Sequence, residues 1–139
     1  MNSNTLAPAN ISFTQSNGLG ILQNSVWQVF ITVTQKNCGN DAEVPFDLTG
    51  YTGKCSIKVN AGDENPIAEP LVTITDAEKG EFSLSLTSAQ TAEIPATGKA
   101  YFETTLYQYD LYFIDQNDNY FRALEGYVSV SPTVTDSND

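Results

Sequence analysis

The stretch from Tyr107 to Pro132, YQYDLYFIDQNDNYFRALEGYVSVSP, decides the fold class. Apolar and polar residues alternate over 107–115 and again over 120–131, and the polar residues 116–119 separate the two runs. Alternation with a period of two is typical of strands, and an Asn/Asp turn between two such runs predicts a β-hairpin. Pro132 cannot donate to a strand ladder, so the second strand ends there. The hairpin indicates an all-β protein.

Other strands are expected on both sides of a single helical turn. The alternation predicts strands over 25–34, 51–60, 71–75 and 81–86, and 100–106 is expected to extend the hairpin's first strand. Thr87 and Gln90 have the spacing of a capping box, and Pro95 ends the short helix that follows, the one helix expected. About seven or eight strands with frequent turns predict an antiparallel β-sandwich with an immunoglobulin-like layout.

The chain is short enough for one domain, and its 139 residues divide into three parts. Residues 1–10 are polar with one proline and are expected to be a flexible arm, 11–135 the β-sandwich, and 136–139 a polar tail. Asp47 is expected to cap a turn in which Gly50 takes a positive φ. Apolar residues at alternate positions of a strand point to the same side of the sheet. Those of the predicted strands are expected to form one core: Trp27, Val29, Ile31, Phe82, Leu84, Tyr109, Leu111, Phe113, Leu124, Val128 and Val130.

Composition excludes several classes of function. The net charge of −11 opposes binding to nucleic acid and to anionic membranes. The chain has no histidine, which removes the usual general base and the commonest metal ligand, so we expect no enzyme, no metal site and no cofactor. No signal peptide and no membrane-spanning run is predicted. Whether Cys38 and Cys55 pair is left open.

Three motifs carry a resemblance to a known family. They are FDLTGYT at 46–52, GEFSLSLTSAQT at 80–91 with IP at 94–95, and YDL at 109–111 continuing to LEGYVSVSP at 124–132. In this order they resemble the immunoglobulin-like domain of tailed-phage structural proteins, such as the N-terminal domain of upper baseplate proteins. The resemblance covers roughly residues 25–135, although the segment 98–108 is longer than the family's usual link.

The resemblance implies a non-enzymatic virion structural protein. It would be made in the host cytoplasm and would serve as a tail, baseplate or tail-fibre adaptor module. Its partners would be other phage virion proteins, in a symmetric or homo-oligomeric assembly of several copies, without nucleic acid or membrane. The alternative is a carbohydrate-binding or capsid-decoration sandwich, because such domains bind sugars through exposed aromatic side chains and this chain has a surplus of them.

The interface is expected on 98–108 and the outer face of the hairpin. Phe102, Tyr107, Tyr112 and Tyr127 are the expected anchors. Arg122 is expected in a surface ion pair with Glu125 or Asp110, and an assembly role for it is left open. The acidic loop 115–118 offers oxygen ligands for Ca²⁺, but its spacing does not match an EF-hand.

Overall fold

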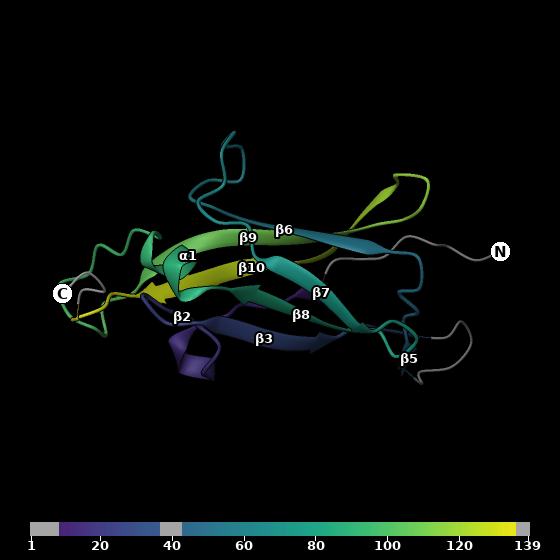
Figure 1. Ribbon diagram of the computed structural model, residues 1–139, viewed down its shortest axis with the longest axis horizontal. Helices are drawn as coiled ribbons and strands as arrows, with labels where there is room; N and C mark the ends of the chain where they lie inside the picture. Colours follow the sequence, from purple (N-terminus) through teal and green to yellow (C-terminus); the bar gives the residue numbers. More distant parts are fainter. Residues whose placement is uncertain (1–8, 37–42, 136–139) are drawn as a thin grey trace.

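The computed structural model in Figure 1 describes residues 9–36 and 43–135, which form ten strands and two short helices. The strands are β1 (Ala9–Asn10), β2 (Ile21–Leu22), β3 (Trp27–Thr32), β4 (Thr34–Lys36), β5 (Glu43–Pro45), β6 (Thr52–Lys58), β7 (Leu71–Asp76), β8 (Glu81–Leu86), β9 (Thr105–Ile114) and β10 (Tyr120–Ser131). The helices are the 3₁₀ helix η1 (Gln15–Asn17) and α1 (Ser88–Ala92). The protein is therefore mostly β-sheet, as predicted.

The strands form two main sheets and a small ribbon. Sheet A has the order β1-β10-β9-β6, with β2 also paired to β10, and sheet B has the order β3-β8-β7. The long strands pair antiparallel, whereas β1 and β2 run parallel to β10. The ribbon β4-β5 lies at one end of the molecule (Figure 1). Sheet A and sheet B lie one above the other in Figure 1.

One core joins the inner faces of the two sheets. The ring of Phe82 on β8 meets the ring of Phe113 on β9 edge-on, with centroids 5.2 Å apart. The predicted core is confirmed, since every member is buried except Ile31, which is partly buried against the others. At the flank, Val72 packs onto Gly53, where a Cβ atom would lie only 2.3 Å from Val72 Cγ1. The absent side chain thus lets β6 and β7 approach closely.

The predicted helix cap at Thr87 and the predicted turn at Asp47 are both present in the structure. Thr87 Oγ1 accepts a hydrogen bond from Gln90 N–H, and Gln90 Oε1 accepts one from Thr87 N–H, which completes the capping box. Asp47 Oδ1 accepts from the Thr49 amide, and Gly50 has φ +83°. Both predictions are confirmed, because these contacts depend only on neighbouring residues.

Three local expectations are wrong. Residues 9 and 10 belong to sheet A rather than to a free arm, because β1 pairs with Leu124 and Glu125. A second helix exists, η1, whose first turn is held by hydrogen bonds between Thr14 and Asn17. The segment 100–104 is not a strand, since Glu103 N–H donates to Ala100 C=O and closes a turn.

Other expectations fall outside the described residues. They concern residues 1–8 of the predicted arm, the tail 136–139, and Cys38. Cys55, on β6, is buried and is not in a disulfide. Burial raises the pKa of its thiol, so Cys55 is a neutral core residue. No helix in the described ranges is long and apolar enough to cross a membrane.

Candidate binding surfaces

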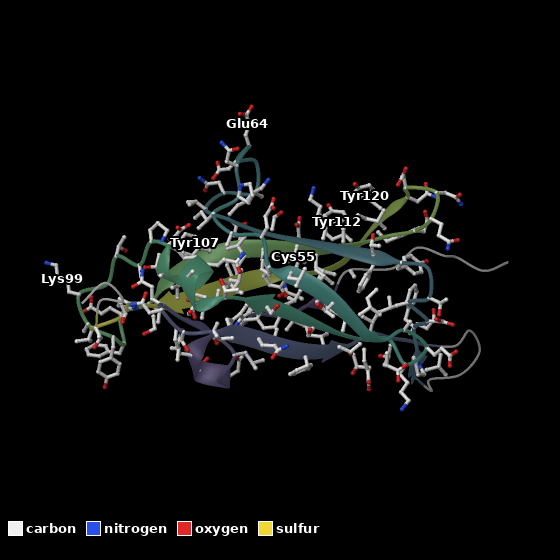
Figure 2. All side chains as sticks on the ribbon, viewed as in Figure 1. Cys55, Glu64, Lys99, Tyr107, Tyr112 and Tyr120 are labelled. Carbon is white, nitrogen blue, oxygen red and sulfur yellow. The ribbon has the colours of Figure 1, made fainter. Side chains whose placement is uncertain are left out.

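Three surfaces of the molecule carry side chains that the core does not use. We call them the tyrosine face, which is the outer face of sheet A, the aromatic tip, which is the loop 98–104, and the uncharged face, which is the outer face of sheet B. Figure 2 shows Lys99, which belongs to the aromatic tip, at one end of the molecule, whereas Tyr112 and Tyr120 on the tyrosine face lie toward the other. The predicted single patch is therefore divided between two surfaces.

Arg122 organises the tyrosine face. Its Nε and one terminal nitrogen donate to the Tyr112 hydroxyl at 2.9 and 2.8 Å. Its guanidinium also lies 3.8 Å from an Asp110 carboxylate oxygen and 3.5 Å from one of Glu125. The predicted ion pairs are confirmed, with both acidic partners at once. The hydrogen bond to Tyr112 is the main cause that raises the pKa of Arg122, so its charge is fixed.

The register of sheet A gathers basic residues around this cluster. Lys54 pairs with Tyr112 across β6 and β9, and Lys58 pairs with Gln108, so both lysines share the face with Arg122. These three are half of the six basic residues in the chain. Within the described ranges neither lysine makes an ion pair. The tyrosine face is thus locally basic on an acidic protein.

A groove of about 320 Å³ opens on the tyrosine face. Its lining includes Lys58, Gln108, Asp110, Arg122, Glu125 and Tyr127. Tyr127 is half-exposed, and its ring offers an apolar surface beside polar donors and acceptors. This volume is at the lower end of the range for ligand sites. The groove can receive a small polar ligand with one apolar face.

Tyr107 is not on any of these surfaces, and its prediction as an anchor is wrong. Its side chain is 5% exposed, and its hydroxyl donates to the carbonyl of Pro95. Burial raises its pKa. Tyr107 is buried because alternate residues of a strand share a face, and Tyr107 points inward with Tyr109 and Leu111 on β9. Tyr107 therefore joins the start of β9 to the segment that follows α1.

The aromatic tip presents Tyr101 and Phe102 to solvent. They are 69% and 70% exposed, and their rings meet edge-on with centroids 5.4 Å apart. Two hydrogen bonds hold the tip in place: Ser131 Oγ at the end of β10 donates to Tyr101 C=O at 2.6 Å, and Lys99 N–H donates to the Glu103 carboxylate within the tip. Leu106, at the start of β9, is also exposed. The tip is a defined apolar projection, and sequence analysis found one of its two rings as an anchor.

The uncharged face is formed by the outward side chains of β3, β8 and β7. Val26, Phe30 and Leu71 are exposed on it. The neighbouring positions on β7 and β8 are small hydroxyl residues, Thr73, Ser83 and Ser85. Glu81, the first residue of β8, and its cross-strand partner Asp76 on β7 are charged residues at one end of this face. The face is weakly apolar and free of charge over most of its length.

In the acidic turn between β9 and β10, the carboxylate of Asp115 accepts hydrogen bonds from residues of the same turn. Asp115 Oδ1 accepts from the amides of Asn117 and Asn119 at 2.8 and 2.9 Å. These bonds, that of Asn119 foremost, lower the pKa of Asp115. No group of three or more Cys, His, Asp or Glu side chains suited to a metal ion occurs in ranges 9–36 and 43–135.

Comparison with known proteins adds no assignment. No protein-family model matches this chain, and no curated protein matches it significantly. The function must therefore be argued from the surfaces.

Proposed function

We propose that this protein is a non-enzymatic structural module of a tailed-phage virion. It assembles in several copies and joins other virion proteins, as a tail, baseplate or fibre adaptor. The aromatic tip is the observation that carries this proposal, and the three motifs described above support it. The proposal assigns no cofactor, no nucleic acid and no membrane to the protein.

We infer that the fold is an immunoglobulin-like sandwich. In that layout strands B, E and D share one sheet and C, F and G the other. Strands β3, β8 and β7 follow the first order, and β6, β9 and β10 follow the second. The Tyr107 hydroxyl bonds back to Pro95 in the connection before β9, as does the tyrosine corner of such domains. Topology and this hydrogen bond together support the inference.

The aromatic tip supports an assembly role because folding does not require its rings. The core is filled by other side chains, while Tyr101 and Phe102 project from a loop that hydrogen bonds hold in place. Exposed aromatic residues that are already ordered lose little entropy on binding and dominate many interfaces. In a symmetric assembly each copy repeats the same contact, so a small patch suffices.

The test is incorporation into particles. A double variant, Tyr101→Ser with Phe102→Ser, is expected to fold normally and to be absent from virions purified after complementation, as measured by mass spectrometry. The matched control is Tyr120→Ser, which removes an exposed ring on the tyrosine face. Normal incorporation of the double variant would refute the role of the tip. Absence of the unaltered protein from virions would refute the function.

The groove on the tyrosine face favours a second candidate, carbohydrate binding. Tyr127 can stack on a sugar ring while Gln108, Asp110 and Lys58 meet its hydroxyl groups. A glycan array followed by NMR titration tests this candidate. Shifts are expected at the amides of residues 108–110 and 125–127, and Tyr127→Ala is expected to abolish them. A glycan array in which no glycan binds would refute carbohydrate binding.

A further inference from the structure

The two main sheets have four edges, and three of them are protected against pairing with another strand. The N-terminal segment covers β10, where Ile11 N–H donates to Glu125 C=O and Phe13 N–H to Tyr127 C=O. Strand β6 carries Lys54 and Lys58, and the amides of Ile67 and Ala68 donate to Ile57 C=O. Lysines and covered edges are the usual protections against unwanted pairing.

The third protected edge is β7. Its register with β8 shifts between Ile74 and Asp76, which interrupts a regular edge. Pro70 immediately precedes the strand, and Val72 packs against Gly53 of β6. A further strand cannot pair regularly along β7.

Strand β3 has none of these protections. Residues 26–34, VWQVFITVT, contain no charged residue, no proline and no glycine, and the pairing of β3 with β8 is regular throughout. Figure 1 shows β3 outside β8, with the purple coil of η1 below the start of the strand, and β3 is the terminal strand of sheet B. It is therefore the edge at which sheet B can be extended.

The hydrogen-bond register tells which backbone groups are available. Val33 N–H donates to Gly80 C=O at 2.8 Å, so the backbone of Val33 faces β8 and these two residues form a hydrogen-bonded pair joined by this one bond. In an antiparallel ladder such pairs recur at every second residue, which makes Ile31–Phe82 and Val29–Leu84 the next ones. The residues between them, Gln28, Phe30 and Thr32, direct their backbone groups to the open edge. No backbone hydrogen-bond partner for these three occurs in the described part of the chain.

These three residues also place their side chains on the uncharged face. Phe30 is 71% exposed at the centre, with Gln28 and Thr32 on either side. An antiparallel copy of this strand, centred on Phe30, sets Phe30 opposite itself and Gln28 opposite Thr32. The edge is thus complementary to itself, and aromatic and polar cross-strand pairs of this kind stabilise sheets.

We propose that β3 pairs antiparallel with β3 of a second copy around a two-fold axis. Three hydrogen-bonded pairs of two bonds each would give about six backbone bonds. The three strands of sheet B from each copy would form one continuous six-stranded sheet. Although each copy has a net charge of −11, no charged residue lies on the paired strands, so no like charges meet there.

This inference deepens the proposed assembly role, since it names a second copy of the chain as one partner. It has a separate test, because the pairing is a property of the purified protein. A contact along one strand is small, so the dimer is weak in solution and depends on concentration. In a symmetric particle the high local concentration of copies would favour it.

The test combines sedimentation with amide hydrogen exchange. Analytical ultracentrifugation should show a concentration-dependent dimer for the unaltered protein and a monomer for Phe30→Lys, which sets like charges opposite each other. The control, Thr73→Lys, lies on the same face but on β7 and should remain dimeric. Circular dichroism checks that both variants are folded.

Hydrogen exchange in the unaltered protein tests the register directly and needs no variant. The amides of Gln28, Phe30 and Thr32 should exchange at least about tenfold more slowly at high protein concentration than at low. The amides of Val29 and Ile31 are bonded to β8 and should not respond. A monomer at every concentration would overturn the proposal, and so would a dimer in which the first three amides stay unprotected. A virion without this protein would refute the assembly role and leave the pairing intact.

Discussion

Replacing Phe13 by alanine tests whether the N-terminal segment is part of the core. Phe13 is 1% exposed and lies between the sheets, with its ring 5.7 Å from that of Trp27 and 5.1 Å from that of Tyr109. Truncating a buried phenylalanine costs about 3–5 kcal/mol, and the loss of two ring contacts places this site toward the upper end. Since small domains are stable by about 5–15 kcal/mol, the loss is a large fraction of the total.

The chain contains its own probe for this measurement. Trp27 is the single tryptophan, and it is buried against Phe13 with its indole N–H donating to Leu19 C=O at 2.9 Å. Urea unfolding followed by tryptophan fluorescence should show the loss of stability, and the melting temperature should fall by roughly 10–20 °C. The emission of the folded variant should also shift to the red as water reaches Trp27.

An exposed phenylalanine provides the control for this experiment. Phe102→Ala should change stability by no more than about 0.5 kcal/mol and should leave the emission unchanged. A loss below about 1 kcal/mol for Phe13→Ala, with unaltered emission, would refute the reasoning. The segment 9–13 would then lie on the sheet without completing the core.

Three further predictions concern the core, a connection and a turn. Leu84→Ala, at a fully buried position on β8, should cost about 2–5 kcal/mol in a denaturant melt, and a loss under half a kcal/mol would contradict the assigned parity. Tyr107→Phe should cost about 0.5–1.5 kcal/mol because Pro95 C=O loses its donor, whereas Tyr101→Phe should cost nothing measurable. The lowered pKa of Asp115 means that its carboxylate stabilises the fold above the unfolded pKa and ceases to do so as the pH falls through the folded pKa. Thermal melts of Asp115→Asn should therefore differ from those of the unaltered protein near pH 7, and the two should converge in acid once the Asp115 carboxyl is protonated in the folded state. A difference that persists at the lowest pH would be inconsistent with this origin.

Sequence patterns predicted those features that depend on neighbouring residues. The capping box at Thr87, the turn at Asp47 and the inward parity of Leu111 and Phe113 all follow from spacing along the chain. Tyr107 has the same parity, so that rule could have placed it in the core as well. Its aromatic character instead predicts an interface anchor, and this is misleading because a buried tyrosine needs only one partner for its hydroxyl.

Other features depend on which distant segments meet, and the sequence could not supply them. The parallel pairing of β1 and β2 with β10 joins opposite ends of the described chain. A register irregularity between Arg122 and Leu124 places Arg122 outward and Leu124 inward although their numbers have the same parity. Arg122 is paired with Tyr112 before the shift, and the shift then sets Glu125 opposite Asp110 and Tyr127 opposite Gln108, which places them on the same face as Arg122. The separation of Phe102 from Tyr112 likewise required the three-dimensional arrangement.

The parallel segment also has a consequence for biosynthesis. Gln15 and Ser129, which contact each other beside this pairing, are 114 residues apart in the chain. At roughly 5–20 residues per second, a ribosome needs about 6–23 s to make the intervening stretch. Throughout that interval Phe13 has no strand to pair with, and Trp27 lacks part of its cover. The nascent chain therefore exposes aromatic residues until β10 has emerged, so a chaperone that binds apolar segments would protect the chain during that interval.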